Sequence, residues 1–373
     1  MKFTGEKKAL QDALQTISGA VTSSSTLPIL ENILLETEED GLNMVATDLE
    51  ITINTSAPVD IQQEGSCTIP ARKFQNLIQE LPSSSTELEF DLQEEDERAI
   101  LTVADTNSRF ELPVLPSEEY PSFPVVEDGF TFQFDANRLE YVLKNSQFAA
   151  ATDSTRSYLC GIYFDLDHEG ATVVATDAHR LALHETNFTG EQYDDKDRSL
   201  LLPVKAAREL IKIIPSDGEI TIKSDGNLVE FELNGGRLIS RLIDEDFPNY
   251  NQVIPQEYKQ RVTVNRKRFY EAVRRVSLLA DQKTRRLLVD LKPGKLQIRA
   301  EASETGSGEE ELEIDYSGDE QTIAFNGDYL ADVLDHIDDD EVYFDLISAD
   351  SPGTFRPIQD NDYLFIIMPL RLS

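Results

Sequence analysis

The sequence predicts an α+β protein built from three tandem copies of one domain, each with two helices laid on antiparallel sheet. Three observations lead to this prediction. A helical stripe of apolar residues recurs six times at nearly equal spacing, a short β-like run precedes each stripe, and two copies share the sequence Val-Ala-Thr-Asp. We place the copies at residues 1–122, 123–252 and 253–373.

The six stripes predict six helices. Each stripe puts apolar or small residues at i, i+3, i+4 and i+7, which share one face of a helix. The stripes begin at Leu10, Phe74, Leu139, Ala207, Phe269 and Leu330, so consecutive stripes start 61 to 68 residues apart. A fixed period of this kind indicates a tandem architecture, with two stripes in each copy of about 125 residues.

The runs before and between the stripes predict strands. The leads are Phe3-Thr4, Thr68–Pro70, Phe132–Phe134, Leu201–Pro203, Val262–Val264 and Ile323–Phe325. The runs Glu219–Lys223 and Val229–Leu233 alternate apolar and polar residues around a Ser-Asp-Gly-Asn turn, which predicts a hairpin. Strand runs outnumber helices, so each copy is expected to be α+β, with two helices laid on antiparallel sheet.

The repeat of Val-Ala-Thr-Asp links the first two copies. It stands at Val45–Asp48 and at Val174–Asp177, and the matching segment of the third copy, from Gly294, is degenerate. Proline-rich, acidic linkers separate the copies at Pro113–Pro124 and Asp244–Pro255. Proline lacks a backbone donor and favours extended chain, so these segments are expected to be boundaries.

Composition indicates a cytoplasmic protein. The first ten residues carry three lysines without an apolar core, and no apolar run approaches 18 residues, which argues against a secretory signal and a membrane span. Two cysteines in 373 residues fit a reducing compartment better than a disulfide framework.

The net charge of −36 would by itself argue against nucleic acid, but its distribution is uneven. The predicted helices lean basic or neutral, above all between Lys259 and Arg286, whereas acidic residues gather in hairpins and linkers. The last helix reverses this pattern, with Asp328, Asp332 and Asp335. Two plainer interpretations stay open: the basic faces are simply solvated, and the overall acidity reflects a high-salt cytoplasm.

No catalytic motif is found in the sequence. Asp177 and His179 form the best candidate, because Asp-x-His can orient an imidazole or offer metal ligands. A metal-dependent or His-based hydrolase centred on this pair is therefore the alternative function. No nucleophile motif, phosphate loop or paired Cys-x-x-Cys accompanies it, and Asp338–Asp340 lack the spacing of a calcium loop. We expect no enzyme activity, no cofactor and no metal.

Several segments in register point to a family. They are "MKFTGEKKALQDAL" from Met1, "TLPILENILLE" from Thr26, "TIPARKF" from Thr68, "VATDAHRLAL" from Val174, "DFPNY" from Asp246 and "MPLRL" from Met368. Together they closely resemble the bacterial DNA polymerase III β subunits, the sliding clamps, from Met1 to Leu372.

The resemblance implies a non-catalytic processivity factor. Two three-domain chains would join head to tail in a closed ring around double-stranded DNA, with helices inside and sheets outside. Expected partners are the DNA polymerase III α subunit, the clamp loader, and other polymerases and repair proteins that carry a clamp-binding peptide. A ring holds DNA by topology, so an acidic protein with a weakly basic lining suffices. A scaffold of the same fold that does not bind DNA is a further alternative.

The resemblance also assigns residues. A peptide cleft between the second and third domains would use Arg156, Leu159, Thr176, Ala178, His179, Arg180, Leu181, Pro248, Val253, Ile366, Met368, Pro369, Leu370 and Arg371. DNA would meet Arg72, Lys73, Lys205, Lys212, Arg274 and Arg275, and the dimer contact would use Phe110, Leu112, Leu278 and Leu279. Two plainer interpretations stay open: the residues assigned to the dimer contact are ordinary core residues, and the cations assigned to DNA are simply solvated. Ala178 stands where relatives commonly have glycine, and Asp153 adds an acid beside the cleft.

Overall fold

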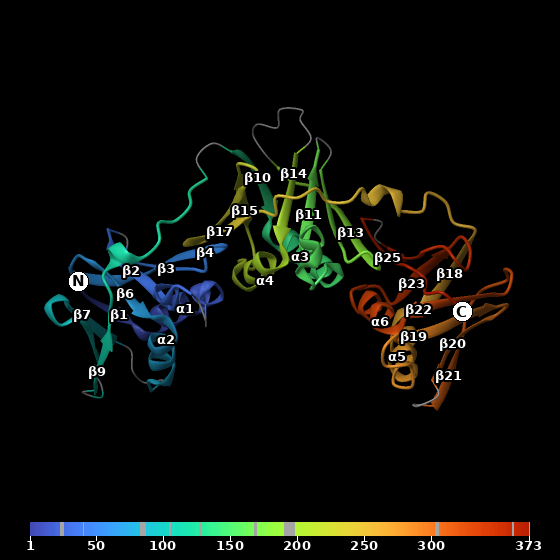
Figure 1. Ribbon diagram of the computed structural model, residues 1–373, viewed down its shortest axis with the longest axis horizontal. Coiled ribbons are helices and arrows are strands. Elements are labelled where there is room, and N and C mark those ends of the chain that lie inside the picture. The colour runs from blue at the N-terminus through green and yellow to red at the C-terminus, as the bar shows by residue number, and fades with distance from the viewer. Residues whose placement is uncertain are drawn as a thin grey trace. The chain divides into compact units, whose positions relative to one another are not determined.

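Each of the six α-helices in the described part of the chain begins at the residue after a strand ends. The pairs are β1 (Lys2–Glu6) with α1 (Lys7–Ile17), β6 (Ser66–Pro70) with α2 (Ala71–Glu80), β10 (Phe130–Asp135) with α3 (Ala136–Ser146), β14 (Arg198–Pro203) with α4 (Val204–Ile213), β18 (Gln260–Asn265) with α5 (Arg266–Ser277), and β22 (Gln321–Asn326) with α6 (Gly327–Asp335). This strand–helix order confirms the predicted leads and stripes (Figure 1).

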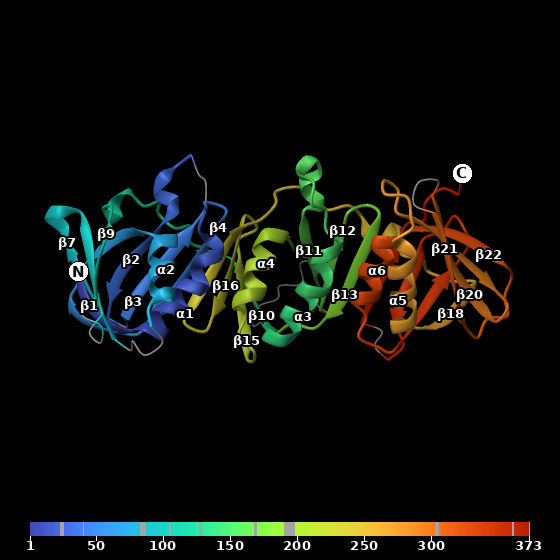
Figure 2. The same ribbon diagram turned by 90° about the horizontal axis from the view of Figure 1, so that it is seen from below.

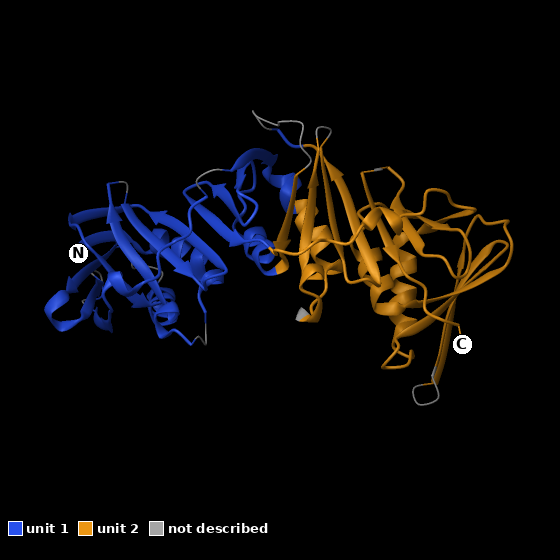
Figure 3. Cartoon of the chain, turned by 45° about the horizontal axis from the view of Figure 1, so that its top comes forward, with its two compact units in different colours: residues 1–140, 188–194, 205–242 blue, residues 141–187, 195–204, 243–373 orange. Residues whose placement is uncertain are grey.

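The computed structural model describes residues 1–22, 26–39, 41–82, 87–103, 106, 108–126, 129–167, 170–189, 198–302, 306–359 and 362–372. The chain divides into two units (Figure 3). Unit 1 comprises Met1–Glu140, Phe188–Asp194 and Lys205–Leu242, and unit 2 comprises Tyr141–Asn187, Asp195–Val204 and Ile243–Ser373.

Unit 1 contains two antiparallel sheets. One has five strands in the order β5-β1-β7-β8-β9, and the other has eight in the order β10-β15-β16-β17-β4-β3-β2-β6. The remaining strands are β2 (Asn32–Glu38), β3 (Gly41–Thr47), β4 (Ile51–Ala57), β5 (Val59–Gln63), β7 (Glu87–Gln93), β8 (Arg98–Val103), β9 (Ser108–Pro113), β15 (Glu219–Ser224), β16 (Leu228–Leu233) and β17 (Gly236–Arg241). Strands β15 and β16 pair antiparallel, which confirms the predicted hairpin.

Unit 2 repeats this plan. Its eight-stranded sheet has the order β14-β11-β12-β13-β25-β24-β23-β18, and its four-stranded sheet the order β21-β20-β19-β22. The strands not yet given are β11 (Gly161–Leu166), β12 (Ala171–Thr176), β13 (Arg180–Thr186), β19 (Arg286–Lys292), β20 (Lys295–Ala302), β21 (Gly306–Glu313), β23 (Glu341–Leu346), β24 (Gly353–Pro357) and β25 (Tyr363–Ile367).

The two eight-stranded sheets each join two of the predicted copies. In unit 1, β17 pairs with β4, from Gly236 opposite Thr55 to Ser240 opposite Ile51. In unit 2, β13 pairs with β25, from Arg180 opposite Ile367 to His184 opposite Tyr363. Backbone hydrogen bonds therefore cross from one copy to the next within each unit.

Helices pack on the sheets through the predicted stripes. Leu10, Ala13, Leu14 and Ile17 of α1 are buried, and α1 contacts β3, β4 and α2. In unit 2, α5 contacts β19, β20, β21 and α6. Within unit 1, α1, α2 and α4 lie on one side of the eight-stranded sheet (Figures 1 and 2). Burial of the stripe supplies most of each helix's stability.

Short polar side chains fix where several helices begin. Asn265 accepts a hydrogen bond from the backbone N–H of Arg268 at 3.0 Å, and Asn326 accepts one from Asp328 at 2.9 Å. Each satisfies an N–H that the first helical turn would leave without a partner. In the described part of the chain, every helix is too short or too polar to cross a membrane.

Candidate functional site

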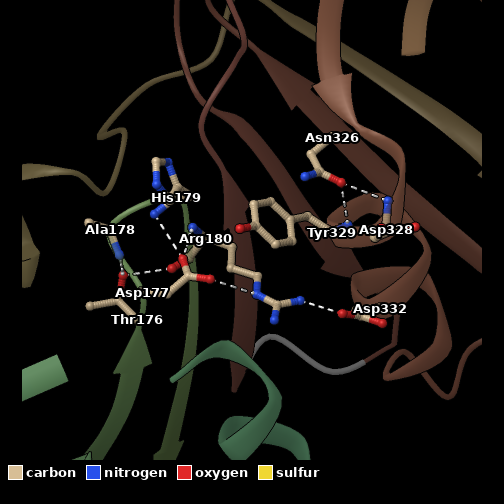
Figure 4. A network of polar contacts seen from close by, with 9 residues as sticks. All are labelled: Thr176, Asp177, Ala178, His179, Arg180, Asn326, Asp328, Tyr329 and Asp332. Carbon is tan, nitrogen blue, oxygen red and sulfur yellow. Dashed lines mark hydrogen bonds and ion pairs between the residues drawn. The ribbon is translucent and has the colours of Figure 1, made fainter. Parts of the chain in front are cut away.

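A tight loop between β12 and β13 forms the centre of the site in unit 2 (Figure 4). The Thr176 hydroxyl donates to the Arg180 carbonyl at 2.6 Å and accepts from the Ala178 N–H at 3.1 Å. The Asp177 carboxylate accepts from the N–H groups of His179 at 2.8 Å and Arg180 at 2.9 Å. Ala178 has φ +73°, a left-handed conformation that favours glycine.

The same loop occurs between β3 and β4 in unit 1. The Thr47 hydroxyl donates to the Ile51 carbonyl at 3.0 Å, and Asp48 accepts from the N–H groups of Glu50 and Ile51 at 3.0 and 2.8 Å. Leu49 has φ +75°, matching Ala178. The repeated Val-Ala-Thr-Asp therefore encodes a turn, and the residues after it decide what each turn can bind.

Arg180 connects the loop to α6. Its Nε lies 3.2 Å from Asp177 Oδ2, and its Nη1 donates to Asp332 (Figure 4). Its guanidinium carbon lies 4.5 Å from the centre of the Tyr329 ring and 5.3 Å from that of Phe148. The side chain is only 12 % exposed. Two carboxylates and two aromatic faces hold this cation in one position.

A cavity of about 270 Å³ opens beside this loop, inside unit 2. Its lining is Arg156, Tyr158, Leu159, Thr176, Ala178, Arg180, Leu181, Pro248, Asn249, Tyr250, Val253, Ile366 and Met368. Leu159, Leu181 and Ile366 are buried and form an apolar floor, whereas Val253 and Met368 are more than one-third exposed at the rim. An apolar pocket with a few polar groups suits a short peptide or a small molecule.

Most of the residues predicted for the cleft lie in this lining. Among the described residues, His179, Pro369, Leu370 and Arg371 lie outside it, although His179 is adjacent, because its carbonyl accepts from the Met368 N–H at 2.8 Å. Sequence reasoning missed Tyr158, Asn249 and Tyr250. Asn249 and Tyr250 belong to the motif Asp-Phe-Pro-Asn-Tyr, which begins at Asp246 and is one of the motifs that carry the resemblance.

The predicted DNA-contact cations differ in their surroundings. Arg72 and Lys73 are exposed on α2. Lys205 donates to Asp48, and Lys212 lies 2.8 Å from both carboxylate oxygens of Glu209. Arg275 makes a two-point contact with Glu310 at 2.6 and 2.8 Å. Arg274 stands exposed, with its guanidinium carbon 5.9 Å from the centre of the Tyr270 ring.

The predicted dimer residues lie at or beside sheet edges. Phe110 and Leu112 are half-buried on β9, which is the last strand of the five-stranded sheet. Leu278 follows α5 and is 78 % exposed, and Leu279 is half-buried beside it. The Leu279 side chain packs against Gly308 of β21, so closely that a Cβ on Gly308 would lie 2.8 Å from Leu279 Cδ1. Strand β21 is the last strand of the four-stranded sheet.

The side chains of Asp177 and His179 make contacts within the fold. Asp177 accepts from two backbone N–H groups and from Arg180, and the His179 ring lies 6.2 Å from the Tyr329 ring in a stacked arrangement. The described residues contain no group of three or more His, Cys, Asp or Glu side chains that could hold a metal ion.

Comparison with known proteins gives matches along the whole chain. Models for the DNA polymerase III beta subunit match residues 1–124 as its N-terminal domain, 133–249 as its central domain and 251–371 as its C-terminal domain. The beta sliding clamps of Synechocystis and Caulobacter vibrioides are each 32 % identical, with 100 % of both chains covered.

Solved structures agree. A sliding clamp from Pseudomonas aeruginosa bound to griselimycin has a TM-score of 0.94 at 29 % identity, and one from Bacillus subtilis has 0.93 at 28 %, each with 100 % of both chains covered. The predicted architecture of three tandem domains is thereby confirmed.

Proposed function

The chain belongs to the DNA polymerase III beta subunit family and has the function of a DNA sliding clamp. We propose that two copies of the chain close head to tail around duplex DNA. We also propose that the cavity of unit 2 binds partner peptides. The apolar cavity beside the Thr176–Arg180 loop is the observation that supports peptide binding. We propose the three domains at residues 1–122, 123–252 and 253–373.

Charge supports the DNA part of the proposal. Each of the first five α-helices contains more Lys and Arg than Asp and Glu, although the whole chain has a net charge of −36. Only α6 is acidic. A helix-lined ring would present a mildly basic surface to the duplex, and sequence-independent phosphate contacts exchange easily, which lets a protein slide. Arg72, Lys73 and Arg274 are the best placed for this role, since Lys205, Lys212 and Arg275 have carboxylate partners.

Two strand edges support the head-to-tail contact. Strands β9 and β21 each end a sheet, so each has one side on which none of the described strands pairs. An edge strand offers unpaired backbone groups to another chain. Joining a β9 edge to a β21 edge is heterologous, and such contacts form a closed ring only when the rotation closes. Leu278, 78 % exposed, and the half-buried Phe110 would add apolar area there.

The cavity supports the docking of peptides from the DNA polymerase III α subunit, the clamp loader, and other polymerases and repair proteins. Leu159, Leu181 and Ile366 would receive apolar side chains, and the Met368 thioether adapts to varied shapes. Arg156 would fix polar or acidic groups of the peptide. His179, Pro369, Leu370 and Arg371 would contact a peptide longer than the cavity itself.

The proposed role is non-catalytic and cytoplasmic. The hydrolase alternative would need a free carboxylate and imidazole, but Asp177 is occupied by its turn and by Arg180. Replacing His179 by Ala would abolish turnover in a hydrolase, whereas here it would only weaken peptide binding.

Two experiments test the proposal. The protein is loaded on nicked circular DNA with a clamp loader and filtered through a sizing column. We expect retention on the circle and release after linearisation, because only a topological link depends on DNA ends. Release that ignores linearisation would refute the ring.

The second experiment titrates a fluorescent peptide carrying the clamp-binding motif of the polymerase α subunit. Met368→Ala should weaken binding, because Met368 is part of the cavity lining. Leu372→Ala, an exposed residue outside that lining, is the control. Equal affinity of both variants would refute the cleft as the peptide site.

A further inference from the structure

One wall of the cavity is built from a segment without strands. The linker Asp244–Pro255 has one short 3-10 turn, Tyr250–Gln252, as its regular structure. It contributes Pro248, Asn249, Tyr250 and Val253 to the lining. Other lining residues stand on the paired strands β12, β13 and β25. A wall without a ladder needs side-chain contacts to hold it in place.

Strand β11 supplies those contacts from its face opposite Ile162 and Phe164. Ile162 and Phe164 are buried, so the alternating residues Tyr163 and Asp165 point to the other side of the sheet. The Tyr163 ring stacks on the Phe247 ring, with centroids 4.8 Å apart and planes 2° from parallel. The Tyr250 hydroxyl donates to Asp165 Oδ2 at 2.8 Å.

Tyr250 therefore has two roles. Its side chain belongs to the cavity lining, while its hydroxyl is bound to Asp165 of β11. It packs with Phe247 and Ile254 against the buried cluster of Val174, Leu181, Leu183, Leu364 and Ile366. Burial, together with the Asp165 contact, raises the pKa of Tyr250, so the hydroxyl keeps its proton and remains a donor at neutral pH.

A further contact ties the linker to another lining segment. Ser157 donates to the Glu245 carboxylate, and Ser157 belongs to the 3-10 segment Ser154–Leu159, which also carries Arg156, Tyr158 and Leu159. The linker is thus fastened both to β11 and to the 3-10 segment Ser154–Leu159.

We propose that Tyr163, Asp165 and the Tyr250 hydroxyl are positioning residues that hold the linker wall at its distance from the cavity floor and so set peptide affinity. This inference rests on the proposed peptide-binding function. A wall already held in its bound position loses less conformational freedom when the peptide arrives. Loosening the wall should leave the floor intact and act mainly on the dissociation rate.

Tyr250→Phe is the sharpest test, because it keeps the ring and removes only the anchored hydroxyl. We expect a loss of affinity on the order of fivefold for the labelled α-subunit peptide, mostly in the off-rate. Asp165→Ala should give a similar loss. Asp165→Asn should restore binding close to wild type, because its amide oxygen can still accept from Tyr250.

Tyr120→Phe is the matched control. Tyr120 lies in the first linker, in unit 1, and its hydroxyl donates to the Asn32 carbonyl at 3.2 Å. Like Tyr250→Phe, it removes one hydrogen-bonded tyrosine hydroxyl from a linker, so it reports the effect of lost stability alone. Thermal unfolding of all variants is followed by circular dichroism, and binding by fluorescence anisotropy and surface plasmon resonance.

The outcomes are separable. Weaker binding by Tyr250→Phe and Asp165→Ala, with rescue by Asp165→Asn and no loss in Tyr120→Phe, supports the inference. A Tyr250→Phe affinity within 1.5-fold of wild type, or an equal loss in Tyr120→Phe, overturns it while leaving the peptide cleft standing. Wild-type protein that does not bind the peptide overturns the cleft and this inference together.

Discussion

Truncation of Leu278 tests the head-to-tail contact quantitatively. Leu278 is 78 % exposed, so nearly its whole side chain is available for burial in a partner. A fully buried leucine side chain contributes about 2 kcal/mol, which scales to about 1.5 kcal/mol here. A two-chain ring contains the contact twice, so Leu278→Ala should cost about 3 kcal/mol. That corresponds to a dimer dissociation constant raised about 150-fold.

Sedimentation velocity over a dilution series measures this constant by following the 42.0 kDa chain and its dimer. The control is Leu115→Ala, which removes a leucine side chain that is 39 % exposed in the first linker. Because Leu115 contacts Thr68 through its own backbone N–H and carbonyl, this variant should dimerise like wild type. A Leu278→Ala constant within threefold of wild type would refute the reasoning, since the exposed side chain would then lie outside the interface.

Three further predictions follow from single contacts. Although burial opposes its charge, hydrogen bonds from Arg299 and Thr322 keep the pKa of Asp290 below its usual value of 3.8. Its stabilising effect is therefore present above about pH 4 and lost as pH falls through the folded-state pKa, so in urea unfolding Asp290→Asn should cost about 2 kcal/mol at pH 7 and progressively less below pH 4. Burial raises the pKa of the Cys67 thiol to about 12. At pH 8, Ellman's reagent should therefore modify the half-exposed Cys160 and should reach Cys67 only after guanidinium is added. Rapid modification of both thiols in the folded protein would contradict this. Replacing Arg72 or Lys73 by Ala should lower the salt dependence of duplex binding by about 0.9 in log–log slope, measured by anisotropy across a potassium chloride series, and an unchanged slope would remove that residue from the DNA surface.

The helices could be predicted from sequence because the same apolar stripe gives both the helical period and the face that is buried. The stripe beginning at Leu10 sets local periodicity and also the buried face, and the strand before it ends where the helix begins. The repeat of Val-Ala-Thr-Asp was equally informative about structure, since Thr47 and Thr176 close the same turn. It was less informative about function, because only the second turn borders the cavity.

The cleft could be predicted in part. Leu181 and Ile366 stand on strands, where alternation tells which side chains face the core. Tyr158 and Tyr250 stand on short 3-10 turns, where the sequence shows no period that would give the direction of a side chain. The chain bends sharply at Arg156, with φ −129° and ψ 73°, beside Tyr158. An aromatic-Pro-x-aromatic pattern in both linkers, at Tyr120 and at Phe247, was the signal that could have found this wall.

Ion pairs across long sequence separations could not be predicted. Lys205 reads as a free cation on a helix, but its partner Asp48 is 157 residues away in sequence. Arg275 of α5 likewise meets Glu310 of β21, 35 residues away in sequence. Which cations remain available to phosphate depends on tertiary placement rather than on the helix face alone.

The ladders that cross from one copy to the next change what the linkers do mechanically. Pairing of β17 with β4, and of β13 with β25, fastens neighbouring copies by backbone hydrogen bonds that do not depend on the chain between them. A protease that nicked either linker would leave two fragments still joined in one continuous sheet. The covalent connection is then redundant at these seams. If the proposed two-chain ring opens for DNA, it would part most easily where the two separate chains meet.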